Sequence, residues 1–447
     1  MKAARWTFTA AVVVGTVFCE ARSAQPAAIF GDHMVLQRGM AVPIWGTGSD
    51  GEKVTVSFAG QSRTATVKRG RWRVDLDALK ASNTGRELKI GGKAIKDVLV
   101  GEVWLCSGQS NMAWTMRRDK SRAAVANTTL PNVRFSPNRG GWLALGPATM
   151  DRCSAAAYNF GKYLHGKLDV PVGLIVRAIG GRSIQYFMPP ETAEACRKKY
   201  SLKYGRGGDG PATGYTGLIE GLIPMAIKGV IWYQGERNAK TGMAWVYQYM
   251  LVDFARAWRA KWGRDDLPII AVQIPVQDSN EYWPILRDSM RRALATVPNY
   301  GMIVYYDKGH LLHPTDKTAC GQRLAMWALG TVYGRKVVYS GPLLKTVTLQ
   351  GAKAVLTFDH VGGGLQNPAG GKDLQHFELC GADGKWVKAA AKVVGDKVEV
   401  TAAAPRAVAV KHVRYAWMLP KPRLVGLQNA EGLPASTFST KPSGKEY

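Results

Sequence analysis

Four residues of this chain have types and positions that suit nucleophilic catalysis. Ser110 follows the apolar run Val103–Cys106 and a turn of small and polar residues, and Gly181, Asn238 and His313 each stand just beyond another apolar run. A serine hydroxyl needs a base to take its proton and donors to hold the oxyanion that forms. Although Ser, Gly and Asn also occur in ordinary turns, the set predicts a nucleophile, a base and an oxyanion hole.

The elements that must position these residues alternate between apolar strands and helices from about residue 97 to residue 334. The segments 155–168 and 247–262 are amphipathic and predict helices, whereas 267–274 predicts a buried strand. This alternation is typical of a largely parallel sheet covered by helices. In such sheets, ligands gather at the carboxyl ends of the strands.

Both ends of the chain are predicted to be rich in β-structure. Period-2 patterns and turn clusters predict strands at 54–58, 64–67, 72–76, 354–358, 397–401 and 407–410. The pattern leaves open whether the two terminal segments form separate sandwiches or pair with each other.

Longer motifs surround the four residues. Trp104-Leu-Cys-Ser-Gly-Gln-Ser-Asn-Met112, Gly229-Val-Ile-Trp-Tyr-Gln-Gly-Glu-Arg-Asn-Ala239 and His313-Pro-Thr-Asp-Lys317 resemble the sialate O-acetylesterase family of the SGNH hydrolases, and the segments 28–38 and 431–436 match it too. The resemblance implies an α/β fold, an SGNH-type, flavodoxin-like three-layer domain with a mainly parallel sheet, flanked by β-rich segments. We expect a signal peptide at 1–24, a β-sandwich-like domain at 25–98, the catalytic domain at 99–336 and a β-rich domain at 337–447.

The resemblance also implies roles for individual residues. Ser110 would be the nucleophile and His313 the base, and the oxyanion hole would comprise the Ser110 amide, Gly181 and Asn238. Further substrate contacts are expected from Gln109, Arg182, Gln234 and Glu236, although Glu236 is better explained as a carboxylate that holds its loop. The implied substrate is an O-acetylated carbohydrate, with acetylated sialic acid ahead of acetylated xylan or other glycans. A catalytically silent glycan-binding protein on the same fold is the alternative from another class.

The chain departs from the family pattern near both catalytic residues. Ala113 stands where relatives usually carry an acid after Ser-Asn-Met, and no acid lies between Lys308 and Pro314 to orient the histidine. His310 occupies the position of the usual aspartate and is the alternative base. The missing acid weakens the expectation of a triad, and the sequence leaves open whether an acid orients His313.

Composition narrows the remaining possibilities. The net charge of +27 is dispersed and comes with no nucleic-acid-binding signature, so we expect a basic surface and no nucleic-acid partner. No metal-ligand spacing or nucleotide motif is present, so no metal or cofactor is expected. The basic and apolar N-terminus predicts export, to the periplasm or beyond the cell, without a membrane span. Five cysteines would remain after cleavage, either in one or two bridges or reduced. The sequence does not set the oligomeric state.

Overall fold

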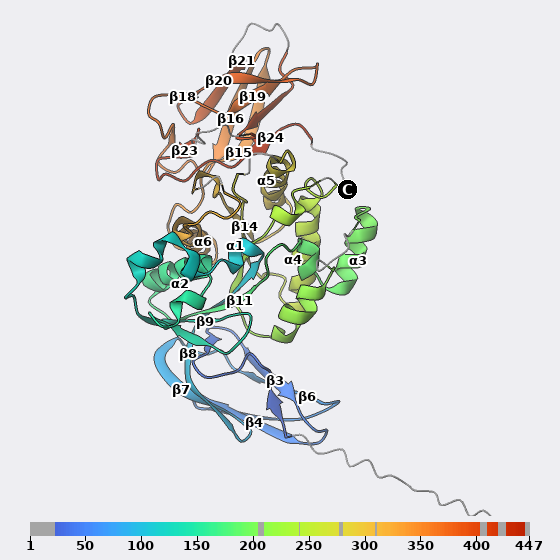
Figure 1. Cartoon of the computed structure of the whole chain (residues 1–447), viewed down its shortest axis with the longest axis vertical. Coiled ribbons are helices and arrows are strands. Elements are labelled where there is room, and N and C mark those ends of the chain that lie inside the picture. Colours follow the sequence, from blue (N-terminus) through green and yellow to red (C-terminus); the bar gives the residue numbers. More distant parts are fainter. Residues whose placement is uncertain are drawn as a thin grey trace, which may run out of the picture.

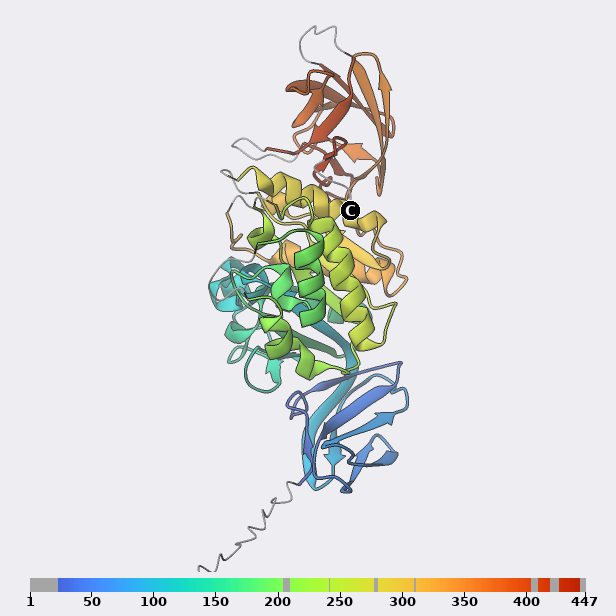
Figure 2. The ribbon, with the colours of Figure 1, turned by 90° about the vertical axis from the view of Figure 1, so that its right-hand side faces the viewer.

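The computed structural model describes residues 23–203, 210–240, 242–276, 280–308, 311–402, 409–418 and 426–442. In this part of the chain, an N-terminal group of strands, a central α/β region and a C-terminal group of strands follow one another along the long axis (Figures 1 and 2). The two terminal β segments lie at opposite ends, and their described strands do not pair with each other. The predicted signal peptide lies outside the described residues up to residue 22.

The N-terminal strands are β1 (Gln25–Pro26), β2 (Val35–Gln37), β3 (Val42–Thr47), β4 (Lys53–Phe58), β5 (Gln61–Thr66), β6 (Arg71–Leu76), β7 (Ser82–Ile90) and β8 (Lys93–Gly108). β8 is 16 residues long and continues from this group into the centre of the molecule. Its first residues alternate between buried and exposed, whereas every residue from Val98 to Gly108 is buried. The strand therefore changes from a half-buried to a fully buried environment along its own length.

The central strands are β9 (Leu130–Ser136), β10 (Leu143–Leu145), β11 (Val172–Ala178), β12 (Gly229–Tyr233), β13 (Ile269–Val272) and β14 (Tyr300–Ile303). They join β8 in the order β10-β9-β11-β8-β12-β13-β14, within a sheet of 11 strands in the described residues. The pairings from β9 to β14 are parallel. However, β10 and the N-terminal strands β4, β5 and β7 pair antiparallel. The sheet as a whole is mixed, so the prediction of a mainly parallel sheet holds only in part.

Helices cover both faces of the central strands, and they are α1 (Ser110–Ala113), α2 (Ala155–Leu168), α3 (Pro190–Lys199), α4 (Tyr247–Trp262), α5 (Tyr282–Arg292) and α6 (Thr318–Thr331). Successive side chains of a strand point to opposite faces. Accordingly, Val103 and Leu105 pack in the core that contains α4, while Trp104 and Cys106 pack in the core that contains α2 and α6. This double burial explains why the central strands read as continuous apolar runs.

The C-terminal strands are β15 (Leu343–Gln350), β16 (Lys353–Asp359), β17 (Leu365–Gln366), β18 (Asp373–Leu374), β19 (Phe377–Cys380), β20 (Trp386–Val394), β21 (Lys397–Ala402), β22 (His412–Tyr415), β23 (Gln428–Asn429) and β24 (Phe438–Ser439). In the described residues, the strands of this group pair antiparallel. The strand predicted at 407–410 is wrong where it is described: residues 409 and 410 belong to no strand. The Val410 N–H donates to the carbonyl of Gly351, which lies in the turn between β15 and β16. This bond therefore joins Val410 to a turn and not to a neighbouring strand.

The cysteines and the apolar character of the helices can both be described. All five of the cysteines Cys106, Cys153, Cys196, Cys320 and Cys380 are buried and unbridged. Along the described ranges, we find no helix with the length and apolar character that crossing a bilayer requires.

The ends of β8 and β12 approach each other closely at Gly108, which yields a test of the fold. Gly108 has φ of +137°, and a Cβ there would lie 2.1 Å from the carbonyl oxygen of Tyr233. We expect Gly108→Ala to combine backbone strain of about 1–3 kcal/mol with a steric clash. Gly60→Ala is the matched control, because Gly60 also has a positive φ, of +84°, but open space around it. Urea unfolding should show a larger stability loss for Gly108→Ala, and equal losses would contradict the close approach.

Candidate active site

Ser110 lies at the carboxyl end of β8 and is the first residue of α1. The turn before it is fixed by the neighbouring strand, because the Gln109 N–H donates to the Tyr233 carbonyl at 2.9 Å. The loop after β11 passes on another side, since a Cβ on Gly180 would lie 3.4 Å from the Cβ of Ser110. Ser110 therefore stands at the edge of the sheet where strand ends from three segments meet.

The structure brings His313 to Ser110. The His313 Nε2 atom lies 2.8 Å from the Ser110 Oγ atom, although the two residues are 203 positions apart. This is the distance at which a neutral imidazole can accept a hydroxyl proton. His313 lies between β14 and α6, on the segment that the sequence motif identified.

The surroundings of His313 favour its neutral form. Burial lowers the pKa of His313, and the positive charges of Lys317 and Arg118 lower it further. The imidazole stacks on Trp114, with ring centres 5.7 Å apart and planes inclined by 21°. Within the described ranges, Ser110 is the hydrogen-bond partner of His313, and no carboxylate bonds to it. The alternative base His310 lies outside those ranges.

The glycine loop after β11 is tied to the serine turn. The Ile179 N–H donates to the Gly108 carbonyl at 3.2 Å, and the exposed Gly181 that follows has φ of +70°. Next to it, the Arg182 guanidinium lies 5.0 Å from the centre of the Tyr186 ring. The Arg182 Nε is buried and has no hydrogen-bond partner. The loop thus brings Gly180 next to Ser110, and Gly181 and Arg182 follow it in the chain.

Gln109 and Gln234, both predicted to contact substrate, form a buried cross-link. The Gln234 Nε2 donates to Gln109 Oε1 at 3.1 Å and to the Arg182 carbonyl at 3.0 Å. Its Oε1 accepts a bond of 2.6 Å from the Tyr247 hydroxyl. Both glutamines are nearly inaccessible to solvent. The two glutamines connect the loops that follow β8, β11 and β12. A direct contact with substrate stays a prediction for each of them.

Asn238 is fully buried and directed at the same loops. Its Oδ1 accepts from the Ile184 N–H at 3.0 Å and from Gln234 Nε2 at 2.8 Å. Its Nδ2 donates to Gln185 Oε1 at 3.0 Å and faces the Met243 sulfur at 3.8 Å. In this arrangement the amide that was predicted to serve the oxyanion hole is engaged with Gln185, and its catalytic role stays a prediction.

Glu236 holds its loop through a hydrogen bond. Its Oε1 accepts from the Asn111 Nδ2 at 2.5 Å, while its buried Oε2 has no partner. Burial raises the pKa of Glu236, although the bond from Asn111 and the charge of Lys317 act in the opposite direction. Glu236 is therefore tied to the residue that follows Ser110, and a contact with substrate stays a prediction.

Sequence reasoning missed three side chains that shape this site. They are Asn111 and Lys317, which bond to each other at 2.6 Å, and Trp114, which stacks on His313. Asn111 and Lys317 stand inside the quoted motifs, so their position was visible, but their contact across 206 residues was not.

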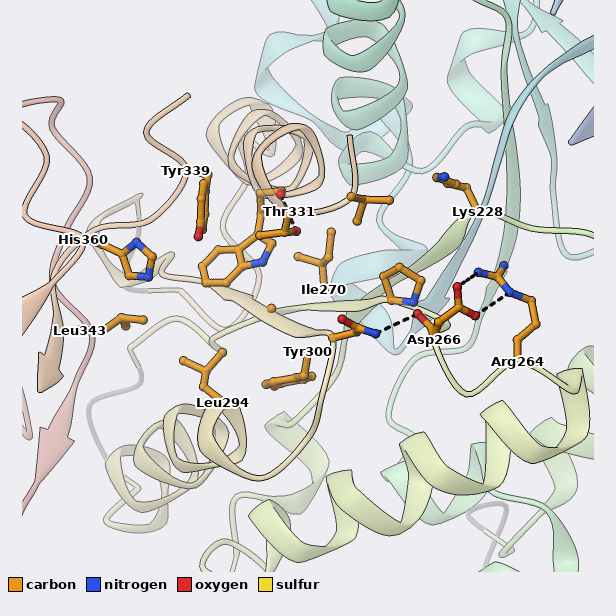
Figure 3. A pocket seen from close by; sticks show the side chains of 15 residues that line it. Lys228, Arg264, Asp266, Ile270, Leu294, Tyr300, Thr331, Tyr339, Leu343 and His360 are labelled. Carbon is orange, nitrogen blue, oxygen red and sulfur yellow. Dashed lines mark hydrogen bonds and ion pairs between the residues drawn. The ribbon is translucent and has the colours of Figure 1, made fainter. Parts of the chain in front are cut away.

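The part of the chain that is described holds no group of three or more His, Cys, Asp and Glu side chains able to bind a metal ion. A cavity of about 510 Å³ lies at the other edge of the sheet, where Lys228 precedes β12 and Tyr300 begins β14 (Figure 3). The residues that line it do not include a predicted site residue, and its Arg264 is already paired with Asp266 at 3.0 Å. The contact between a predicted nucleophile and a predicted base is found at Ser110 and His313 and not at this cavity.

The chain is similar to known proteins over most of its length. Residues 100–330 match the family described as "Carbohydrate esterase, sialic acid-specific acetylesterase". Sialate O-acetylesterase of Homo sapiens is 27% identical over 459 residues, which cover 88% of this chain and 87% of that protein. The mouse enzyme, Sialate O-acetylesterase of Mus musculus, is 27% identical over 86% of this chain and 88% of its own length.

A solved structure is similar along almost the whole chain. A carbohydrate acetylesterase from Xanthomonas citri superimposes with a TM-score of 0.85 and 34% identity, covering 94% of this chain and 100% of that one. The family match includes the segments that carry Ser110, Gly181, Asn238 and His313. The chain therefore belongs to the carbohydrate esterase family of sialic acid-specific acetylesterases, and it is a carboxylic ester hydrolase.

Proposed function

We propose that this enzyme removes acetyl groups from the hydroxyls of a carbohydrate through a serine acetyl-enzyme. The observation that carries the proposal is the contact of 2.8 Å between His313 Nε2 and Ser110 Oγ. A poised nucleophile and base also favour an enzyme over a silent glycan-binding protein on the same fold. The family membership supports the acetyl ester as the group that is cleaved.

In the proposed reaction, His313 accepts the hydroxyl proton as Ser110 Oγ attacks the acetyl carbonyl carbon. The N–H groups of Ser110 and Gly181 and the amide of Asn238 stabilise the oxyanion. The tetrahedral intermediate collapses, the sugar oxygen leaves with the proton from His313, and an acetyl-serine remains. Water then gives a proton to His313 and attacks the acetyl-serine. His313 returns this proton to Ser110 Oγ as the acyl bond breaks, which releases acetate and restores both residues.

Acetylated sialic acid is the proposed substrate, ahead of acetylated xylan or other neutral glycans. The support comes from the names of the relatives and from Arg182 beside the glycine loop, whose buried Nε lacks a partner. A guanidinium can pair with the carboxylate that distinguishes a sialic acid from a neutral sugar.

Three further expectations belong to the same proposal. The order β11-β8-β12-β13-β14 with parallel pairings supports a flavodoxin-like description of the central sheet. The limits at residues 98 and 336 remain our division into domains, with β8 crossing the first of them. The basic and apolar N-terminus supports export to the periplasm or the medium.

The serine mechanism is tested first. Ser110→Ala should abolish hydrolysis of a chromogenic acetyl ester, because the covalent route requires the hydroxyl. His313 must be neutral to accept a proton, so activity is full above its pKa and falls as the pH drops through it. Because burial lowers this pKa, the fall should come below pH ~6.5, the usual value for a histidine. Turnover by Ser110→Ala at the wild-type rate, or a profile that falls well above that pH, would contradict the mechanism.

The substrate class is tested by the ratio of kcat/KM values for 9-O-acetylated sialic acid and acetylated xylo-oligosaccharides. Arg182→Ala should lower the value for the sialic acid by about 10- to 100-fold, the usual worth of a hydrogen bond to a charged group, and leave the neutral substrate unchanged. Arg86→Ala, which removes an exposed arginine of β7, is the control for net charge. A wild-type preference for the neutral substrate would reject the sialate assignment but keep the esterase.

The role of Asn238 is tested with a matched pair of variants. As an oxyanion donor, Asn238 should lose about 10²- to 10³-fold in kcat when replaced by alanine. Gln185→Ala removes the partner of the Asn238 amide at 3.0 Å without removing the donor, so it should retain kcat. If both variants lose stability and both keep kcat, Asn238 only holds the loop.

A further inference from the structure

The backbone on either side of His313 is held by one buried polar unit. Asn111 Nδ2 donates to the carbonyl of Leu312 at 2.9 Å, and Lys317 Nζ donates to the carbonyl of Pro314 at 2.7 Å. The two donors are linked, because Lys317 Nζ also donates to Asn111 Oδ1 at 2.6 Å. His313 therefore lies between two carbonyls that are fixed by the same pair of side chains.

This unit begins at the nucleophile. Asn111 directly follows Ser110 in α1 and is fully buried, as is Lys317. The pair thus joins the helix that presents the serine to the segment that presents the histidine. A shift of about 1 Å in such a geometry can cost 10²-fold in rate, so the rigidity of this joint matters for catalysis.

Aromatic rings enclose the ammonium group. Lys317 Nζ lies 5.4 Å from the ring centre of Tyr233, 5.7 Å from that of Trp114 and 5.9 Å from that of Tyr305. Trp114 is the ring on which His313 stacks. The same cation therefore also lies over the ring that sets the plane of the imidazole.

The charges around the unit come from several elements. Glu236 accepts from Asn111 Nδ2, so a buried carboxylate and a buried ammonium are joined through one amide. Asp119 accepts from the Lys317 N–H at 2.9 Å, Asp316 is exposed nearby, and the Cys320 thiol also faces Lys317. Burial lowers the pKa of Lys317 to about 8, while these acidic groups oppose the shift.

We propose that Lys317, together with Asn111, is a positioning residue for the catalytic histidine and takes the part that a carboxylate hydrogen-bonded to the histidine plays in a Ser-His-Asp triad. The proposal rests on the proposed role of His313 as the base. It explains how a chain without an acid between Lys308 and Pro314 holds its histidine in place.

This arrangement differs from a carboxylate in its effect on protonation. A carboxylate favours the imidazolium and raises a histidine pKa, whereas an ammonium disfavours it. Lys317 and Arg118 are the charged groups that act on His313, and both lower its pKa. The acid limb of the pH profile is the range in which activity falls as His313 becomes protonated. Its position depends on the charge of Lys317, whereas the packing of Lys317 affects the maximal rate.

Lys317→Met tests the proposal, because methionine keeps much of the volume and removes the charge and the donors. With a chromogenic acetyl ester, kcat should fall by about 10- to 100-fold, KM should change much less, and the acid limb should move to higher pH. Lys120→Met is the control: Lys120 is exposed at the start of the short 3₁₀ helix Lys120–Val125, and its backbone N–H, which the substitution keeps, donates to the Thr315 carbonyl. A folded Lys317→Met enzyme whose acid limb does not move would overturn the proposal, whatever its kcat.

Asn111→Ala separates orientation from charge and serves if Lys317→Met does not fold. It removes the bond to the Leu312 carbonyl but keeps the ammonium, so kcat should fall while the acid limb stays near its wild-type position. Wild-type kcat in this variant would overturn the proposal. Failure of the proposed function looks different, since Ser110→Ala and His313→Ala would then retain turnover.

Discussion

The close approach of β8 and β12 at their carboxyl ends is the constraint on which the active site depends. Gly108 lies so near Tyr233 that no side chain fits between them. The next residue uses its N–H to bond the same carbonyl, and the residue after that is Ser110. Strand β8 is buried on both faces and pairs with β11 on one side and β12 on the other. The chain therefore leaves the sheet at the carboxyl end of β8. The serine is therefore presented by the rigid centre of the sheet and not by a free loop.

Behind the serine, polar groups replace the apolar core. Gln109, Gln234 and Asn238 connect the turn after β8 to the loops after β11 and β12, and Asn111 connects it to the histidine segment. A buried polar group costs free energy unless it is hydrogen-bonded. A network whose members satisfy one another therefore allows few alternative arrangements, and it transmits the position of one loop to the next. This explains why Gln109 and Gln234, two residues expected to touch substrate, are buried between loops.

The sequence predicted the elements well where one environment extends over a whole element. The helices expected at 155–168 and 247–262 coincide with α2 and α4, since their amphipathic patterns reflect a single buried face. The boundary expected at residue 98 instead lies inside β8, because the pattern there changes from alternating to fully buried within one strand. The change in sequence pattern near residue 98 thus reflects the point where β8 becomes buried on both faces, and β8 itself continues beyond it.

At the site, the segments could be predicted but most of the contacts between them could not. Ser110 and His313 each follow an apolar strand, and the fold brings such strand ends to one edge. Which side chains then bond across that edge depends on rotamers and distances that no local pattern encodes. The Lys317–Asn111 pair shows this: both residues were inside recognised motifs, yet neither motif indicates the other.

The absence of an orienting acid in the sequence between Lys308 and Pro314 has a physical consequence for the base. In a triad, one carboxylate both orients the imidazole and stabilises its protonated form. Here, orientation comes from bonds to the carbonyls of Leu312 and Pro314 and from the stack on Trp114, none of which supplies negative charge to the ring. The imidazolium that forms during the reaction is therefore less stabilised, and the base is weaker. In return, His313 stays neutral at lower pH, and the positive charge of Lys317 is favoured by the nearby carboxyl groups of Glu236, Asp119 and Asp316. Orientation and charge, which a triad couples in one residue, are separated in this site.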